Sequence, residues 1–258
     1  MLVKLVSDEE WHIEREEFFI GGQGITKSKH HWYLTVTHWQ LAKDFPLKIW
    51  REGYIYKIDC VTNKIVSHKK IPFQESRYDH VGDIDYFNGL VYLSLEDVIY
   101  SRPRILICNE DLSTYDYADL VDQTHMPWCV INPESGLLLS SEFDFVKYIN
   151  FYEIKPDRSA KLVDKLGLSR TLRKVQGGCI HEDSLYVSCD DDVKGIYRID
   201  LKSGNVYMLL ETRIPYEMEG ICADFLENPI FHFIDHEGHL YHAQKVSRSL
   251  YAMVNATR

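Results

Sequence analysis

Long apolar runs are missing from this 258-residue sequence, and none approaches the ~20 residues that a bilayer-crossing helix needs. The N-terminal stretch of residues 1–16 turns acidic after six residues and holds no long apolar segment, which argues against a secretory signal. Positive charge is also scarce, because 29 lysines and arginines face 39 aspartates and glutamates, for a formal net charge of −10. We therefore expect an acidic globular protein with no nucleic-acid or membrane partner.

Cysteine pairs at the spacing of zinc knuckles or thioredoxin-like motifs are missing too, because none of the six cysteines stands in a CxxC pattern. Most of them lie in apolar strand-like runs such as residues 104–108 and 178–180. We therefore expect small buried side chains in a reducing, cytoplasmic compartment. Common catalytic signatures are absent as well: the sequence has no GxSxG elbow, no HExxH motif, no Walker loop and no Rossmann fingerprint.

Apolar residues nevertheless make up 45% of the chain, which is enough for a substantial core. They form short runs rich in Val, Ile, Tyr and Leu between Gly, Asn, Asp and Pro residues, and helical periodicity is almost absent. The clearest hairpin covers residues 195–211, with a turn at residues 202–205 where Gly or Asn supplies a positive φ. Residues 54–67 repeat this pattern. The sequence therefore predicts an all-β fold.

A longer repeat combines a start that usually contains Gly, an apolar strand, a polar turn and a second apolar strand. The five copies are spaced by 58, 46, 50 and 42 residues, and they begin near Gly24, Gly82, Trp128, Gly178 and Gly220. A four-stranded propeller blade needs about 40–50 residues. The repeat therefore predicts one five-bladed β-propeller domain over residues 1–258, in which a loop inserted at residues 39–53 lengthens the first spacing.

The last copy leaves room for only about three strands before Arg258. We expect residues 2–6 or 11–14 to supply the missing outer strand, because closing the ring removes open sheet edges. A β-sandwich with additional strands is the alternative, but it gives no reason for a repeat of about 50 residues.

Three of the copies open with Gln23-Gly-Ile, Gln176-Gly-Gly and Glu219-Gly-Ile, and hairpins such as residues 196–204 accompany these openings. In these features the chain resembles the broad superfamily of repeat propellers that includes gluconolactonase-like proteins and plant-type glutaminyl cyclases. The resemblance covers most of the chain and is architectural. It implies a β-propeller fold, and it transfers no set of catalytic residues.

Propeller geometry brings the starts of the first strands and the ends of the second strands to one end of the central axis. Most residues at these positions are acidic, and His, Gln and Trp accompany them. The residues expected around this opening are Gln23, His80, Asp83, Glu96, Trp128, Glu142, Gln176, Asp190, Glu219, Asp235 and His236. Acidic residues at strand ends are often solvated turn residues, so a functional and a purely structural ring both remain open.

Within this ring, His80, Asp83 and Glu219 are the candidate acid/base residues, because carboxylates in a cleft raise one another's pKa and His titrates near neutral pH. His80 could equally bridge adjacent blades through hydrogen bonds. Trp128 is a candidate for stacking on a ligand or, alternatively, for filling the channel. The remaining candidates for substrate binding are Gln23, Glu96, Glu142 and Gln176.

A metal site is a second hypothesis for the same end of the molecule. A tight turn at Glu237-Gly238 would set His236 and His239 opposite each other, with Asp235 or Glu219 as the third ligand. Three consecutive aspartates begin at Asp190. Asp190, Asp235 and His236 are therefore the candidate ligands for a divalent cation (Ca²⁺, Mg²⁺ or Zn²⁺), although a solvated hairpin tip and a solvated acidic loop explain the same residues.

These observations predict an enzyme that acts on a small polar molecule at the axial end, with hydrolase or lyase chemistry and with or without a divalent cation. The alternative is a non-catalytic propeller that binds a ligand or a protein. An enzyme should collect charged residues with shifted pKa values in a closed site. A binding module should instead present a broad apolar or aromatic patch.

Overall fold

The computed structural model describes residues 2–3, 10–17, 22–41, 49–72, 80–97, 100–120 and 122–246. Every regular element among these residues is a β-strand, which confirms the all-β prediction. No helix in the described part of the chain is long and apolar enough to cross a membrane.

Hydrogen bonds join the described strands into four sheets. The first sheet has the order β3 (Gly22–Lys27), β4 (His31–Leu41), β5 (Ile49–Asp59) and β6 (Ile65–Lys70). A second has the order β15 (Val175–His181), β16 (Ser184–Cys189), β17 (Gly195–Asp200) and β18 (Val206–Glu211). A third has the order β19 (Met218–Asp224), β20 (Ile230–Asp235), β21 (His239–Val246), β2 (Glu10–Glu17) and β1 (Leu2–Val3).

The fourth sheet has eight strands and consists of two antiparallel groups of four. One group is β7 (His80–Phe87), β8 (Leu90–Glu96), β9 (Arg104–Asn109) and β10 (Tyr115–Leu120). The other is β11 (Val130–Ile131), β12 (Leu138–Ser140), β13 (Val146–Ile154) and β14 (Ser159–Leu172). Among the residues that the structure describes, two residue pairs in a parallel register between β10 and β14 join the groups, so they are separate antiparallel units that touch at their outer strands.

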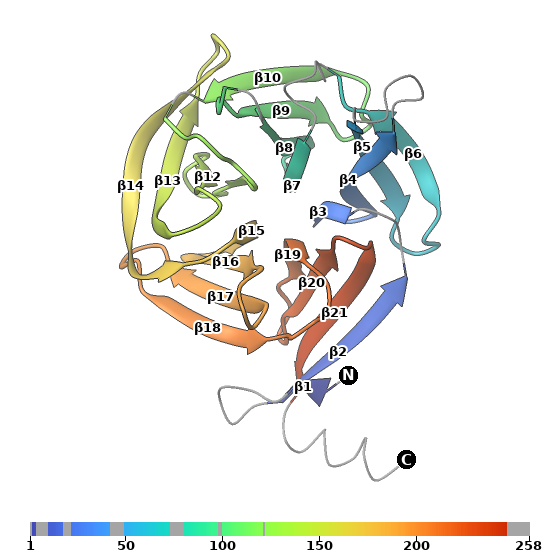
Figure 1. Ribbon diagram of the computed structural model, residues 1–258, viewed down its shortest axis with the longest axis vertical. Helices are drawn as coiled ribbons and strands as arrows, with labels where there is room; N and C mark the ends of the chain where they lie inside the picture. The colour runs from blue at the N-terminus through green and yellow to red at the C-terminus, as the bar shows by residue number, and fades with distance from the viewer. Residues whose placement is uncertain are drawn as a thin grey trace.

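The strand groups surround a central axis, with β3, β7, β15 and β19 nearest to it and β6, β10, β14 and β18 on the outside (Figure 1). Each group packs on the next through a cluster of buried apolar side chains. Tyr33 and Leu106, for example, share the cluster between the β3–β6 and β7–β10 groups. Ile25 and Ile234 share the cluster between the first and the last sheet. This propeller arrangement, and not two stacked sheets, buries the apolar faces of the strands.

The structure differs from the sequence-based prediction for residues 39–53, and it adds a strand pairing near the N-terminus. The loop expected at residues 39–53 is partly strand, because β4 and β5 pair from His31 with Asp59 as far as Leu41 with Ile49. Residues 42–48 lie outside the described part. Near the N-terminus, all eight residues of β2 pair with β21, the last described strand of the chain.

Three innermost strands meet backbone to backbone at the axis, which only glycine permits. A Cβ atom on Gly24 would lie 2.5 Å from the Cα of Asp83. One on Gly177 would lie 2.6 Å from the Cα of Gly220, and one on Gly220 would lie 2.6 Å from the Cα of Gly24. Real Cβ atoms do not come this close to other atoms, so β3, β15 and β19 reach the axis because these three positions lack side chains.

Candidate active site at the axial end

Polar side chains gather at one end of the axis because the innermost strands all begin there. Gln23, His80, Gln176 and Glu219 occupy the first or second position of β3, β7, β15 and β19. Glu96 ends β8, and antiparallel pairing sets it opposite His80. The structure thus brings five of the predicted residues to the same end of the inner strands.

His80 connects two of these residues through its two ring nitrogens. Nδ1 lies 2.6 Å from Oε2 of Glu96, and Nε2 lies 2.7 Å from Oε1 of Gln23. Nε2 of Gln23 in turn lies 3.1 Å from the carbonyl oxygen of Gly22 and 3.4 Å from Oε1 of Glu219. Since both nitrogens of His80 face oxygen acceptors, both contacts are hydrogen bonds when the ring carries two protons.

Glu96 also contacts a second histidine, His125, through its other carboxylate oxygen. Burial by itself would raise the pKa of Glu96, but hydrogen bonds with His125 and His80 outweigh burial and lower that pKa to about 2. Burial alone would lower the pKa of His125. The Glu96 carboxylate more than reverses this effect, so the pKa of His125 is raised. Glu96 is therefore a permanent negative charge between two imidazole rings.

Glu219 has the opposite character, although it lies on the other side of the same Gln23 amide. Glu219 is 5% exposed. Burial raises the pKa of Glu219 well above its ordinary value, and the negative charge of neighbouring Glu217 raises it further. A carboxyl group with a raised pKa stays protonated and can donate that proton.

Glu217 and His236 complete this part of the site. Oε1 of Glu217, which is exposed, accepts a hydrogen bond from Nε2 of Gln176 at 3.1 Å. Nδ1 of His236 lies 3.5 Å from Oε1 of Glu219 and 3.1 Å from Nε2 of Gln23. The side-chain ligand atoms of Glu217, Glu219 and His236 all lie within 4.8 Å of one another. Two carboxylates and an imidazole suit a divalent cation such as Zn²⁺, so this group fits a metal.

The position of Asp83 corrects the prediction that it is a catalytic residue. Asp83 is completely buried, and its carboxylate accepts the backbone N–H groups of Ile25 and Gly178, each at 3.0 Å, and that of Ile221. These donors belong to β3, β15 and β19. Burial raises the pKa of Asp83 well above its ordinary value, and the backbone hydrogen bonds act against it. Asp83 therefore links four inner strands below the site and offers no atom to a ligand.

Trp128 and Glu142 also differ from their predicted roles in substrate binding. Trp128 is completely buried, and its Nε1 donates to Oγ of Ser141 at 3.0 Å. Its ring packs so closely that a Cβ on Gly178 would lie 2.8 Å from it, so Trp128 fills space between sheets and does not stack on a ligand. Glu142 accepts the backbone N–H groups of Thr124 and His125, both at 2.9 Å, which fixes the loop that carries His125.

The predicted metal ligands do not come together. Asp190 forms ion pairs with Lys174 and Lys194 and accepts the backbone N–H of Met218. Asp235, which is completely buried, accepts Tyr241 Oη at 2.7 Å and the Nδ1 of His239 at 2.9 Å. These carboxylates are held by ion pairs and hydrogen bonds within the protein, and their role as cation ligands stays a prediction. Of the three residues, only His236 belongs to the group with Glu217 and Glu219.

Sequence analysis missed Glu217 and His125. Glu217 precedes Glu219 by two positions, and residues i and i+2 of an extended segment lie on the same side, so the pattern Glu-Met-Glu was a usable signal. His125 stands in an irregular segment before Pro127, where no periodicity predicts its direction. Its approach to Glu96 depends on how neighbouring strand groups pack.

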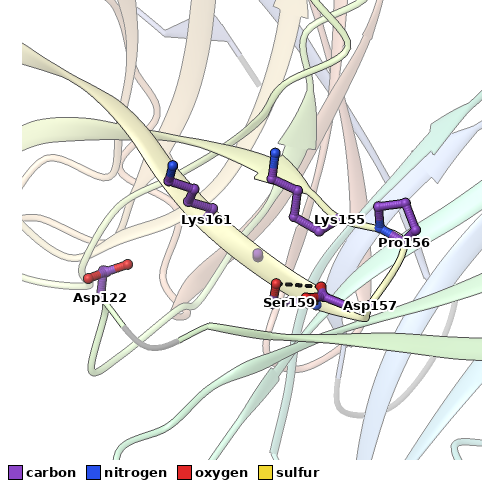
Figure 2. Close-up of a pocket in the computed structure, with 7 residues that line it drawn as sticks. Asp122, Lys155, Pro156, Asp157, Ser159 and Lys161 are labelled. Atoms are coloured by element: carbon purple, nitrogen blue, oxygen red, sulfur yellow. Dashed lines mark hydrogen bonds between the residues drawn. The ribbon is translucent and has the colours of Figure 1, made fainter.

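The described surface also has hollows away from the axis. One lies on the outer rim beside the β10–β14 contact, where Lys155 and Lys161 point in the same direction and Asp157 accepts a hydrogen bond from Ser159 at 2.6 Å (Figure 2). Another lies between β2 and Pro215. The exposed side chains of the first hollow form no buried acid/base pair, so the axial end remains the better candidate.

Comparison with solved structures agrees with this architecture. The fold is similar to that of a glutaminyl cyclase from Myxococcus xanthus (TM-score 0.62, 11% identity, 92% of this chain and 97% of that chain). It is also similar to a β-xylosidase (0.61, 8%, 91% and 95%) and to a gluconolactonase from Xanthomonas campestris (0.57, 10%, 93% and 91%). No protein-family model and no curated protein matches the sequence. The chain has the propeller fold of the glutaminyl cyclase-like and gluconolactonase-type structures, which confirms the architectural resemblance.

Proposed function

We propose that the chain is one five-bladed β-propeller whose ring is closed by its N-terminal segment. Two observations support this. The described strands divide into five antiparallel groups, since the eight-stranded sheet consists of two groups that touch at only two residue pairs. In addition, β2 supplies the strand next to β21, so that the last group has at least four strands, as each of the others has four.

Deletion of residues 1–20 is expected to abolish soluble expression. The deletion removes β2, whose residues Trp11 and Ile13 are 5% and 2% exposed, and leaves β21 as an open edge. The measurement is the soluble fraction and the thermal melt of the truncated chain. The control is the full-length variant His12→Gln. It keeps Trp11 and Ile13 and changes a side chain on the other face of β2, so it should melt like the parent protein. A truncated protein that stays monomeric and melts normally would refute the closure.

We further propose that the protein is an enzyme that acts on a small polar molecule at the axial end, by hydrolase or lyase chemistry. The observation that carries this proposal is the pair of Glu217 and Glu219, one exposed and one buried, whose carboxyl groups lie within 4.8 Å of each other. Burial and the negative charge of Glu217 raise the pKa of Glu219 well above its ordinary value, which favours the protonated form of Glu219. Neighbouring carboxyl groups with separated pKa values are a general source of acid/base assignments.

In this mechanism Glu219 is the general acid and Glu217 is the general base. During hydrolysis the Glu217 carboxylate takes a proton from water as the water oxygen bonds to the electrophilic carbon. Glu219 gives its proton to the leaving oxygen as the bond from carbon to that oxygen breaks. In an elimination Glu217 takes the proton from carbon instead. Proton exchange with solvent restores both residues.

Gln23 and His80 serve this pair as positioning residues. The Gln23 amide donates toward Glu219 and His236, and its oxygen accepts from His80. Glu96 and His125 fix His80 in turn. A chain of hydrogen bonds therefore sets the orientation of the carboxyl pair from the opposite side of the axis.

The alternative use of the same residues is a divalent cation site with Glu217, Glu219 and His236 as its ligands, in which both carboxyl groups are ionised and coordinate the cation in place of their acid/base roles. The cation would supply Lewis-acid polarisation of a substrate oxygen. Zn²⁺ or Mn²⁺ at 100 times its dissociation constant is expected to stabilise the protein by about 2.7 kcal/mol, which corresponds to a rise of about 5–10 °C in melting temperature. His236→Gln should remove most of this rise, and His181→Gln, far along β15, should not. An unchanged melt across Ca²⁺, Mg²⁺, Mn²⁺, Zn²⁺ and chelator would rule the cation out.

The proposed activity is tested with a panel of small substrates. Sugar lactones, β-xylosides, peptides with N-terminal glutamine and simple carboxylic esters cover the chemistry suggested by the structurally similar enzymes. We expect turnover of one class by the parent protein and by Glu182→Gln, an exposed carboxylate on the β15–β16 turn. Glu217→Gln should be inactive on the same class. Ligand-dependent stabilisation without turnover of any class would instead support the non-catalytic binding propeller.

A further inference from the structure

A polar row crosses the middle of the last sheet, away from the candidate active site. In the strand register, Glu14 of β2 lies opposite His242 of β21, and His242 lies opposite His232 of β20. Nδ1 of His232 is 2.6 Å from Nδ1 of His242, and Nε2 of His232 is 3.3 Å from Oδ2 of Asp224 at the end of β19. Such a row places two imidazoles in direct contact inside the protein.

The same row spans the seam between the last sheet and the first, which we define as the contact of β19–β21 with β3 and β4. Asp224 also accepts a hydrogen bond from Nζ of Lys27, on β3, at 2.6 Å. The His232 ring packs edge-on against Trp32 of β4, with 4.9 Å between ring centroids. His232 and Trp32 are 5% and 7% exposed. His232 is therefore buried where the two sheets meet, and His242 beside it is partly buried.

Hydrogen-bond chemistry limits the protons that this pair can hold. Asp224 remains a carboxylate, because its hydrogen bonds with His232 and Lys27 lower its pKa to about 2. It therefore holds a proton on Nε2 of His232, and Nδ1 of neutral His232 must accept from Nδ1–H of His242. A proton added to His242 can lie on Nε2, which is 3.9 Å from Oε1 of Glu16. A second proton, on Nδ1 of His232, would set two N–H groups against each other.

The other charged and titratable groups around the pair do not remove this conflict. Lys27 is a cation beside His232 and disfavours a further positive charge there. The Cys222 thiol, opposite His232 in the register, is kept neutral because burial raises its pKa well above the ordinary value. Burial raises the pKa of Cys60 as well. Glu14 and Glu16 are exposed on β2 and face His242, and the charge of Glu14 favours a proton there, but burial and His232 outweigh it.

We propose that the His232–His242 pair makes this seam sensitive to acid, so that the first and last sheets separate in mildly acidic solution. While the two sheets are in contact, the His232–His242 pair binds at most one added proton. When the sheets separate, each histidine can bind an added proton. The pKa values agree with the geometry: burial lowers that of His232, and burial together with the charge of His232 lowers that of His242 to about 4.

The direction of the effect follows from proton linkage. A histidine whose pKa is depressed in the closed form stabilises that form above its free pKa near 6.5, and this contribution is lost as the pH falls. One excluded proton lowers the ratio of closed to open seam by up to about tenfold per pH unit below 6.5. The seam also runs through the candidate active site, because Gln23 lies on β3 and Glu219 on β19. If the proposed function holds, acid therefore separates Gln23 from Glu219 and switches the site off.

Hydrogen–deuterium exchange of the full chain between pH 7.5 and 4.5 tests the seam without any assay of activity. After correction for intrinsic exchange, we expect protection of β3, β4, β20 and β21 to fall by about tenfold per pH unit below 6.5, while β13 and β14, across the axis from the seam (Figure 1), keep theirs. Fluorescence of Trp32 should shift to the red over the same range, and Trp32→Phe should lose this signal. Equal loss of protection in all strands, or none at the seam, would overturn the proposal.

A matched pair of variants assigns the effect to the histidines. In His242→Gln the amide can either donate to His232 or accept from it, so the seam should tolerate acid about one pH unit further. His181→Gln changes a histidine of β15 that stacks on Phe225 and takes no part in the polar row, so it should leave the transition where it is. Identical transitions in both variants would contradict the assignment. Should His242→Gln fail to fold, the comparison of seam strands with β13 and β14 in the parent protein decides alone.

Discussion

Asp83→Ala is expected to lower the free energy of unfolding by about 4 kcal/mol or more, and to leave little soluble protein. The change removes the acceptor for the buried N–H groups of Ile25, Gly178 and Ile221, which belong to three different inner strands. Each buried donor without a partner costs about 1–3 kcal/mol. Total stabilities of only about 5–15 kcal/mol leave little margin for such a loss.

Asp83→Asn refines this test, because it keeps the shape of the side chain and replaces one acceptor oxygen with a donor. We expect it to fold and to be destabilised by about 1–3 kcal/mol in chemical denaturation. Asp85→Asn is the matched control. Asp85 lies two residues further along β7 and accepts the N–H of Ile131 at 2.8 Å, which ties it to one neighbouring group only. Equal stability of the Asp83 and Asp85 variants would show that Asp83 is not the axial link.

Glu219→Gln is expected to reduce kcat by about 10²–10⁴-fold while the protein keeps or gains stability. The loss reflects the missing general acid, whose contribution is typically of that size. The gain has a different cause: burial disfavours the ionised form of Glu219, and a neutral amide of the same shape has no such form. Steady-state kinetics on the substrate class found by the panel, together with a thermal melt, measures both.

The pH profile gives a second test of the same assignment. A general acid works only while protonated, so activity should fall as the pH rises through the raised pKa of Glu219. Glu182→Gln, on the exposed β15–β16 turn, should keep both the rate and this alkaline limb. A Glu219→Gln enzyme with the parental rate would remove Glu219 from the mechanism, whatever the structure of the site.

Local patterns predicted much of the architecture. The hairpin expected at residues 195–211 is the pair β17 and β18, and its turn contains Gly204 at a φ of +72°. The repeat starts near Gly24, Gly178 and Gly220 lie in β3, β15 and β19. These features depend on the alternation of side chains and on residues that tolerate positive φ, both of which are local properties.

The predicted loop at residues 39–53 failed for a local reason as well. Strands β4 and β5 extend into it because each continues to alternate, and the sequence gives no breaker until the segment that follows Leu41. The third copy was harder to recognise, since β11 and β12 have only two and three residues. Short strands carry too little periodicity to define their ends.

For the site, strand position was enough to bring Gln23, His80, Glu96, Gln176 and Glu219 to one end of the axis, because the ends of paired strands must coincide. Strand position could not predict how far below the axial opening each side chain lies. Asp83 stands three residues after His80 on the same strand, yet it lies below the opening, where the glycines of three other strands let its carboxylate reach their amides. Trp128 is likewise removed from the opening by packing between sheets.

The sequence by itself determined the strands, their pairing along the chain and the set of polar residues at one end, since these follow from side-chain alternation, turn residues and repeat length. Only the tertiary structure decided which of those residues are chemically distinct. Glu96 and Glu219 are the same residue type at equivalent strand ends, but two histidines lower the pKa of one, and burial beside Glu217 raises that of the other. The difference arises from groups on other strands, and a pKa depends on what surrounds the carboxyl group in space, not on its neighbours in sequence.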